Sequence, residues 1–174
     1  LGAILADDMG LGKNIQALAW IQHLRETEAD PAPALVVCPT SVMHNWQREA
    51  ERFVPGLRVL ALASGQGRHA LRDEIPAHDL VITNYTLLRR DLEAWRRQRL
   101  GVVILDEAQN VKNSETLQAK AARSLNAVWR VALTGTPVEN HVGDLWSLFQ
   151  FLNPGLLGGE AEFKREFFVP IQAR

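Results

Sequence analysis

Eight residues near the start of the chain combine the types that can hold a phosphate group: Asp7-Asp8-Met9-Gly10-Leu11-Gly12-Lys13-Asn14. Gly10 and Gly12 lack a Cβ, so the backbone there can turn sharply and present its N–H groups inward. The helix expected after them begins with unpaired N–H groups, and Lys13 adds a cation for the β- and γ-phosphates. The strict phosphate-loop pattern has Gly where this chain has Asp7, and Ser or Thr where it has Asn14. The segment predicts a phosphate-binding loop, and the alternative is a glycine-rich turn with a surface lysine.

A pair of carboxylates follows a buried apolar run further along the chain. Asp106-Glu107-Ala108-Gln109 comes directly after Val102-Val103-Ile104-Leu105. A carboxylate at the tip of such a strand stands where open α/β sheets bind their ligands. Asp106 could hold Mg²⁺ through water, and Glu107 could polarise an attacking water. The alternative is an ordinary helix N-terminus, where the helix dipole favours acidic residues in any case.

A third polar turn, Leu133-Thr134-Gly135-Thr136-Pro137, also follows an apolar run. Threonine hydroxyls beside a glycine at this position could sense a γ-phosphate, with a simple turn as the alternative. Together the three segments predict that separate strand tips supply the parts of one nucleotide and magnesium site.

The elements that must position these residues are short apolar runs alternating with segments of helical periodicity. The runs are rich in Val, Ile and Leu and nearly continuous in apolarity, as strands of a parallel sheet buried on both faces are. Strands alternating with helices predict an α/β fold with a central, mostly parallel sheet. A last helix, running through Leu152, is expected to end at Asn153-Pro154-Gly155. The expected strands are Gly2–Leu5, Ala34–Cys38, Arg58–Leu62, Leu80–Thr83, Val102–Leu105 and Val128–Leu133.

Composition excludes several classes of protein. The chain has 174 residues, of which 47% are apolar, and a net charge of −1. These values fit an ordinary globular domain and argue against disorder and against a uniformly basic surface for nucleic acid. The single Cys38 rules out a disulfide scaffold, and no run approaches the roughly 20 apolar residues of a membrane span.

The order of these motifs resembles the first RecA-like lobe of the SWI/SNF-type helicase-like ATPases in helicase superfamily two. The resemblance covers nearly the whole chain, and its sequence style is typical of bacteria. It implies a three-layer P-loop α/β fold. The matching strings are Gly2–Lys13 (motif I), Val36–Ser41 with Asn45-Trp46 (motif Ia), Val81–Tyr85 (motif Ib), Asp106–Asn110 with Lys112-Asn113 (motif II), and Leu133–Asn140 (motif III).

The resemblance also implies ATP and Mg²⁺ as cofactors and double-stranded DNA as the track of a translocase that does not generally separate strands. It assigns catalysis to Lys13, Asp106 and Glu107, and the metal to Asn14 and Asp106. It assigns nucleotide contacts to Asp8, Met9, Gly10, Leu11, Gly12, Lys13 and Asn14. It assigns DNA contact or coupling to Thr40, Ser41, Asn84, Tyr85, Thr134, Gly135 and Thr136. A monomeric protein of the cytoplasm, associated with the nucleoid if bacterial, is expected.

The chain departs from the family in ways that predict weak activity. Asn14 replaces the threonine whose hydroxyl is a direct Mg²⁺ ligand in P-loop enzymes. The adenine-reading segment and the second RecA-like lobe with its arginine finger are expected outside this sequence. We therefore expect residues 1–153 to form the first lobe, residues 154–174 to lead toward the second, and the isolated piece to be inactive. The alternatives are a non-hydrolysing nucleotide-binding or DNA-docking scaffold and a strand-separating or RNA helicase.

Several residues of interest are given ordinary interpretations. Ser41 could be either a phosphate-gripping hydroxyl or an N-cap. Trp46 is expected to pack in the core rather than stack on a base, and Cys38 to be a small buried hydrophobe. No histidine has the spacing of a metal ligand. The basic cluster is interpreted as a solvated helix face, with a DNA-phosphate patch as the alternative; it comprises Arg89, Arg90, Arg96, Arg97 and Arg99.

Overall fold

The computed structural model of the chain describes residues 2–8, 10–63, 73–135 and 142–168. Its centre is a six-stranded sheet in the order β1-β6-β5-β2-β4-β3, in which every pairing is parallel. The strands are β1 (Gly2–Leu5), β2 (Ala34–Cys38), β3 (Val59–Ala61), β4 (Leu80–Asn84), β5 (Leu100–Leu105) and β6 (Ala127–Leu133). The α/β class is confirmed, and the sheet, predicted as mostly parallel, is parallel throughout its described strands.

The strands are buried because both faces of the sheet are covered. Successive residues of a strand point to opposite faces. In β2, Val36 and Cys38 belong to one hydrophobic cluster, while Leu35 and Val37 belong to the other. Every residue of β2 is buried, which explains why the sequence there is continuously apolar rather than alternating.

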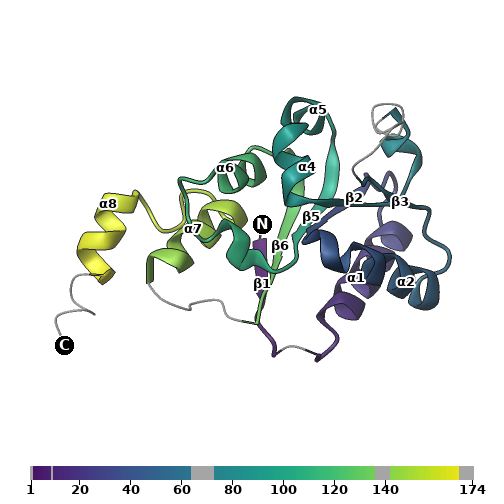
Figure 1. Cartoon of the computed structure of the whole chain (residues 1–174), viewed down its shortest axis with the longest axis horizontal. Coiled ribbons are helices and arrows are strands. Elements are labelled where there is room, and N and C mark those ends of the chain that lie inside the picture. Colours follow the sequence, from purple (N-terminus) through teal and green to yellow (C-terminus); the bar gives the residue numbers. More distant parts are fainter. Residues whose placement is uncertain (1, 9, 64–72, 136–141, 169–174) are drawn as a thin grey trace.

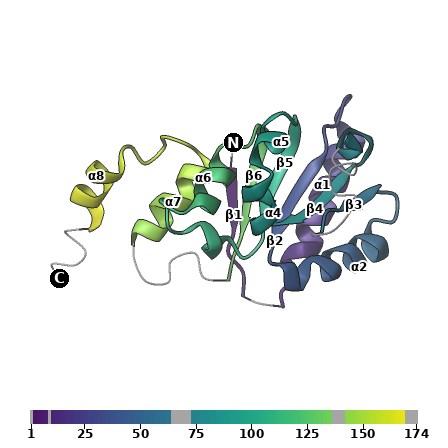
Figure 2. The same cartoon turned by 45° about the horizontal axis from the view of Figure 1, so that its top comes forward.

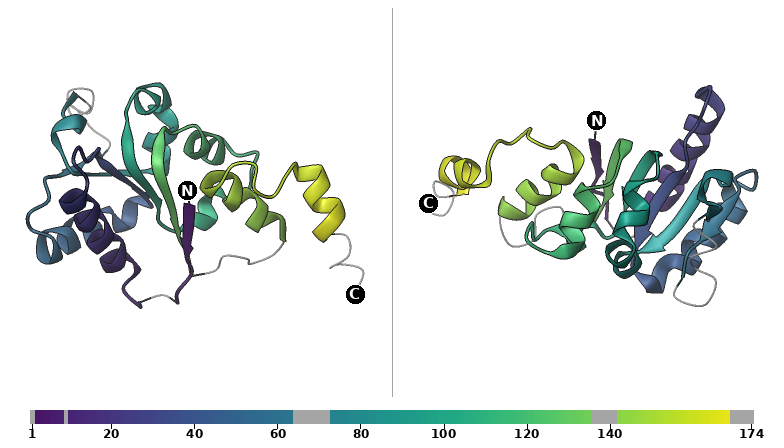
Figure 3. Two further views of the ribbon diagram at one scale, coloured as in Figure 1. Left: turned by 180° about the vertical axis from the view of Figure 1, so that it is seen from behind. Right: turned by 90° about the horizontal axis from the view of Figure 1, so that it is seen from above.

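Helices form the two outer layers (Figure 1). The first cluster is closed by α1 and α2, and the second by α4 to α7; the view from behind shows the same division (Figure 3). The α-helices are α1 (Lys13–Thr27), α2 (Met43–Phe53), α4 (Tyr85–Arg90), α5 (Leu92–Arg96), α6 (Leu117–Arg123), α7 (Val142–Leu152) and α8 (Glu160–Phe163). Three short 3-10 helices are described, η1 (Thr40–Val42), η2 (Ile75–Ala77) and η3 (Ala108–Val111), together with one π-helix, η4 (Lys164–Phe168).

Side chains fix where several elements begin and end. The Asn84 side chain accepts a hydrogen bond from the Leu87 amide and caps α4, as Thr116 caps α6. Helix α7 ends at Leu152, and the turn after it contains Gly155 with a φ of 84°. The Asn153 side chain then accepts from the Gly2 amide at 2.9 Å and donates to the Gly2 carbonyl at 3.3 Å, so it satisfies backbone groups of the edge strand β1.

The last described segment stands apart from the three layers. Helix α8 lies at the end of the molecule farthest from α1 and α2 (Figure 2). Phe163 is buried there, and Trp146 of α7 donates through its indole to the Gly158 carbonyl at 3.3 Å. The proposed boundary after residue 153 stays a prediction. Among the described helices, none combines the length and the apolar character needed to cross a bilayer.

Candidate nucleotide site at the carboxyl edge of the sheet

The sheet order brings the three predicted loops to one edge. Strands β1, β6 and β5 are neighbours, and because they are parallel their carboxyl ends lie on the same side. The segment before α1 follows β1, the Thr134-Gly135 turn follows β6, and the Asp106-Glu107 pair follows β5. Such an edge is where open α/β sheets bind ligands.

The loop after β1 has the backbone of a phosphate-binding turn. Gly10 has a φ of 87° and Gly12 a φ of 75°, which residues with a Cβ adopt only at a cost. No other atom stands within 4 Å of where a Cβ at Gly10 would be, so the requirement there is conformational. Lys13 begins α1, and its ammonium donates to the carbonyls of Asp7 at 2.7 Å and Asp8 at 2.9 Å. Met9 lies outside the described residues.

One cavity joins this loop to the acidic turn. Its volume is about 410 Å³, and it opens between the loop, the first turn of α1, helix α2 and the end of β5. The lining residues are Gly10, Gly12, Lys13, Asn14, Ile15, Val42, Asn45, Glu49, Asp106 and Glu107. The structure therefore brings four of the predicted motif I residues together with Asp106 and Glu107 of motif II, while Asp8 and Leu11 are not among the lining residues. The lining residues from η1 and α2 were not predicted, although Val42, Asn45 and Glu49 recur at the spacing of one helix face.

Asp106 is buried at 7% exposure, and neutral donors hold its carboxylate. The Trp46 indole donates to Oδ2 at 2.8 Å, and the Glu107 amide donates to Oδ1 at 2.9 Å. Burial raises the pKa of Asp106 above its usual value and outweighs the lowering effect of these two donors and of the Lys13 charge. Burial of Cys38, reinforced by the Asp106 charge, raises the pKa of its thiol to about 12. Cys38 is buried, as the sequence predicts.

The turn after Asp106 is strained and connected to the next strand tip. Glu107 has a φ of 50°, so a residue other than glycine adopts the left-handed backbone conformation here. Strained backbone of this kind concentrates at functional sites. The Gln109 side-chain NH2 group donates to the Glu107 carboxylate at 2.5 Å, and the Thr134 hydroxyl donates to the side-chain oxygen Oε1 of Gln109 at 3.2 Å. Motifs II and III are therefore joined through Gln109. Gly135 is part of the described turn, and Thr136 lies outside it.

The predicted DNA or coupling residues divide into two kinds. Thr40 and Ser41 are exposed. No side chain caps η1 or α2, so the N-cap interpretation of Ser41 is wrong. Asn84 and Tyr85 are buried. The Asn84 side chain caps α4, and the Tyr85 hydroxyl donates to the Asp106 carbonyl at 2.7 Å. The burial of both side chains argues against direct contact with DNA, and the hydrogen bond from Tyr85 to Asp106 fits a coupling role for Tyr85.

The oxygen ligands in the cavity suit a magnesium ion whose shell is completed by the phosphates of a bound nucleotide. Within the described ranges, no group of three or more His, Cys, Asp or Glu side chains could hold a metal ion. Mg²⁺ is commonly bound through one or two carboxylates, with waters and substrate phosphates completing its shell. Asp106 supplies such a carboxylate, and Asn14 lines the same cavity.

Three of the five arginines of the basic cluster lie close to a carboxylate. Arg96 pairs with Glu93 at 2.9 Å, Arg99 pairs with Asp30 at 3.1 Å, and Arg90 lies 4.0 Å from Asp91. All five arginines are exposed. These local pairings favour the solvated-face interpretation.

Comparison with known proteins agrees with this geometry. The SNF2-related domain family matches residues 1–174. The Sulfolobus solfataricus SWI2/SNF2 ATPase core solved in complex with double-stranded DNA superimposes with a TM-score of 0.90 and 42% identity, over 99% of this chain and 36% of that one.

Two curated relatives show the same likeness. YwqA of Bacillus subtilis, named as a candidate ATP-dependent helicase/translocase, is 44% identical over 98% of this chain and 19% of its own length. The TATA-binding protein-associated factor MOT1 of Saccharomyces cerevisiae is 39% identical over 99% of this chain and 10% of its own length. The chain thus spans less than a fifth of these two relatives. By sequence, fold and the placement of its motifs, the chain belongs to the SNF2-related domain family.

Proposed function

We propose that this chain is the nucleotide-binding lobe of an ATP-driven motor that translocates on double-stranded DNA. The observation that carries the proposal is the single cavity lined by Lys13, Asp106 and Glu107. Double-stranded DNA as the substrate is supported by the Sulfolobus solfataricus ATPase core, which was solved in complex with it. Translocation is supported by the name of YwqA, a helicase/translocase.

Four residues that line the cavity have parts in the proposed hydrolysis. The Lys13 ammonium exchanges the Asp7 and Asp8 carbonyls for β- and γ-phosphate oxygens, while the loop amides after Gly10 hold the phosphate chain. Glu107 accepts a hydrogen bond from water and orients it for in-line attack on the γ-phosphate. Asp106 and Asn14 would hold Mg²⁺, which when bound neutralises charge on the phosphate oxygens.

The neighbouring tips of β2 and β4 would carry the DNA side of the reaction. The exposed Thr40 and Ser41 hydroxyls precede α2, so they and the first α2 amides can grip one backbone phosphate without any net basic charge. Thr134 is hydrogen-bonded to Gln109, which is hydrogen-bonded to Glu107. Through these bonds Thr134 would couple the state of the bound nucleotide to the rest of the lobe. The second RecA-like lobe of the same polypeptide would supply the arginine finger.

The test is ATP turnover of the full-length protein with duplex DNA, single-stranded DNA or RNA. Duplex DNA should stimulate turnover most, and Lys13→Ala should remove the stimulated activity. Equal stimulation by single strands or RNA would favour a strand-separating or RNA helicase. The isolated chain should hydrolyse ATP barely or not at all, since lack of an arginine finger costs about 10³-fold or more. Turnover near ~1 s⁻¹ by the isolated chain would contradict this.

Asn14 favours a second candidate, a scaffold that binds nucleotide or DNA without hydrolysis. An amide oxygen at this position replaces the hydroxyl that ligates magnesium in P-loop enzymes. Asn14→Thr in the full-length protein should therefore raise both magnesium-dependent nucleotide binding and DNA-stimulated turnover. No gain in either would show that Asn14 is not what limits activity, and nucleotide binding without turnover in both proteins would support the scaffold.

A further inference from the structure

Each backbone and side-chain polar atom of Asp106 has a hydrogen-bond partner, and three of the four partners lie on other elements. Its amide donates to the Val37 carbonyl at 2.9 Å, and its Oδ1 accepts from the next residue of the turn. The two remaining partners are aromatic: Trp46 donates to Oδ2 at 2.8 Å, and Tyr85 donates to the main-chain carbonyl at 2.7 Å. These two partners are 60 and 21 residues away in the sequence.

Burial makes both aromatic donors rigid. Trp46 is 0% exposed and Tyr85 is 5% exposed. Trp46 lies in the core cluster between the sheet and helices α1 and α2, and Tyr85 lies in the cluster on the opposite face. Close-packed side chains keep one rotamer, so the directions of the indole N–H and the phenol O–H are fixed by two separate cores.

We propose that Trp46 and Tyr85 are positioning residues that hold Asp106 in the orientation needed for magnesium, which makes α2 and α4 part of the metal site. This inference rests on the function proposed above for Asp106. An indole N–H leaves the carboxylate its negative charge, whereas an Arg or Lys partner would compete with the metal for it. Outer-shell hydrogen bonds of this kind orient ligating groups, and their loss commonly weakens metal binding by about 10- to 100-fold.

Loss of the Trp46 hydrogen bond should weaken magnesium binding more than loss of the Tyr85 hydrogen bond. Trp46 bonds the carboxylate oxygen itself, so its loss frees the group that would meet the metal. Tyr85 bonds the main-chain carbonyl, so its loss loosens the turn and leaves the carboxylate bonds in place. We therefore expect the effect of Tyr85→Phe to be smaller than that of Trp46→Phe.

The experiment measures how binding of a fluorescent methylanthraniloyl ATP by the full-length protein depends on Mg²⁺ concentration. Trp46→Phe should raise the Mg²⁺ concentration for half-maximal binding by about tenfold, and Tyr85→Phe by about threefold. Binding in EDTA should not change. Trp95→Phe is the matched control, because Trp95 is also buried, at 2% exposure, but lies in the opposite cluster. Its midpoint should stay within about twofold of wild type.

A second replacement separates the hydrogen bond from packing. Site-specific 3-benzothienylalanine at position 46 keeps the shape of the indole and lacks the N–H, so it should reproduce the Trp46→Phe shift even if that variant folds poorly. A wild-type midpoint with this isostere would overturn the inference. Asp106→Asn tests the underlying function: if it leaves the magnesium dependence of wild type intact, the proposed role of Asp106 fails instead.

Discussion

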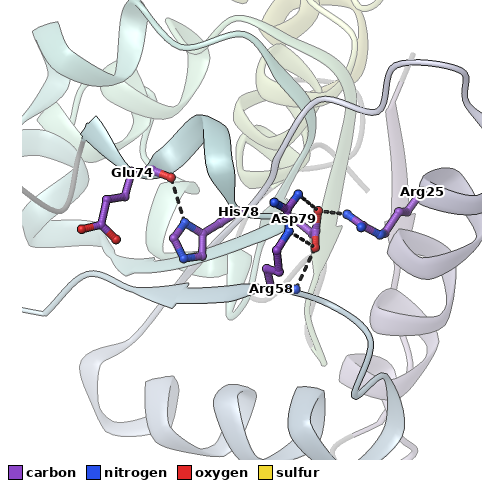
Figure 4. Close-up of polar contacts among 5 residues, drawn as sticks. All are labelled: Arg25, Arg58, Glu74, His78 and Asp79. Carbon is purple, nitrogen blue, oxygen red and sulfur yellow. Dashed lines mark hydrogen bonds and ion pairs between the residues drawn. The ribbon is translucent and has the colours of Figure 1, made fainter.

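Two aspartates at opposite edges of the sheet have opposite surroundings. Asp106 follows β5 at the carboxyl edge, and Asp79 precedes β4 at the amino edge. Both are well covered: the Asp79 side chain is 6% exposed and Asp106 is 7% exposed as a residue. Asp106 receives neutral donors, and no ion pair reaches it within the described ranges. Asp79 lies between two guanidinium groups, those of Arg25 and Arg58 (Figure 4).

The amino-edge cluster, defined by Arg25, Arg58 and Asp79, joins separate parts of the chain. The Arg58 fork donates to Asp79 Oδ2 at 3.1 Å and to Oδ1 at 2.9 Å, and the Arg58 amide adds a bond of 2.7 Å to Oδ2. Arg25 reaches the same carboxylate from α1. Nearby, the His78 ring bonds the Glu74 carbonyl at 2.8 Å (Figure 4). The charge of Asp79 is therefore fully occupied within the protein.

This difference separates a structural carboxylate from one available to a ligand. A covered carboxylate paired with cations has no charge left for another partner, and removing it leaves those cations without their anion, which destabilises the fold. A buried carboxylate held by neutral donors keeps its charge at a cost in desolvation, as groups at functional sites often do. The comparison predicts that substitutions at the two aspartates have separable effects on activity and on stability.

The largest expected effect is the loss of activity on replacing Asp106. Asp106→Asn should lower DNA-stimulated ATP turnover of the full-length protein by at least about 10³-fold, because the charge that would hold magnesium is gone. Its free energy of unfolding at pH 7 should change by less than about 2 kcal/mol, because relief from burying a charge offsets the one donor left facing the amide NH2 group. Steady-state turnover and urea unfolding measure the two quantities. A loss of turnover explained by unfolding would break the distinction.

Asp79→Asn should show the reverse pattern. Two guanidinium groups would lose their anion, and the free energy of unfolding should fall by about 2–4 kcal/mol, below the full cost for a deeply buried pair because Arg58 is 60% exposed. Turnover at temperatures where the variant is folded should match wild type. Asp30→Asn is the control, because its pair with Arg99 is exposed on both sides and should be worth less than about 0.5 kcal/mol.

The sequence predicts the central sheet well because burial on both faces leaves a strong local pattern. Strands β1 and β2 have their predicted ends. Strand β5 begins two residues earlier than predicted, at Leu100, which pairs with Ala127 of β6. Strand β4 extends to Asn84, which pairs with Cys38. Strand β3 is shorter than predicted, at Val59–Ala61. These differences follow from partners that are distant in sequence and that no local pattern contains.

The candidate site is predictable in its residue types but not in its supports. The glycines, Lys13 and Asp106 stand in recognisable strings, and the structure brings them to one cavity. The bond from Trp46 to Asp106 spans 60 residues, and an apolar helix face around Trp46 gives only the packing interpretation. Packing and the hydrogen bond are both present, since the ring is buried while its N–H points at the carboxylate. The role of Asp79 could not be predicted because its partners are distant in sequence, Arg25 in α1 and Arg58 just before β3.

A smaller effect should appear in the pH dependence of stability. The pKa of Asp106 is raised by burial above its usual value of 3.8, so the folded protein holds that proton more tightly than the unfolded chain. The stability tied to the proton is complete below the unfolded pKa and is lost as pH rises through the folded pKa.

Relative to Asp106→Asn, wild type should therefore lose stability as the pH rises above about 4, by at most about 1.4 kcal/mol per pH unit. Urea unfolding of both proteins in EDTA, at steps from pH 4 to pH 7, gives the difference directly. A constant difference across this range would mean that Asp106 titrates alike in both states, and the contrast with Asp79 would lose its electrostatic basis.

The smallest expected effect is that of Arg58→Lys, which tests whether charge or hydrogen-bond geometry stabilises the amino-edge cluster. Arg58→Lys keeps the cation and the backbone bond to Asp79 but removes the planar fork, which a lysine cannot replace. Because Arg58 is largely exposed and Arg25 still neutralises Asp79, the loss should be about 0.5–1 kcal/mol in urea unfolding. Arg99→Lys, in an exposed pair with a single bond, should change stability by less than about 0.3 kcal/mol. If Arg58→Lys instead costs as much as Asp79→Asn, the fork itself and not the neutralised charge is what distinguishes Asp79 from Asp106.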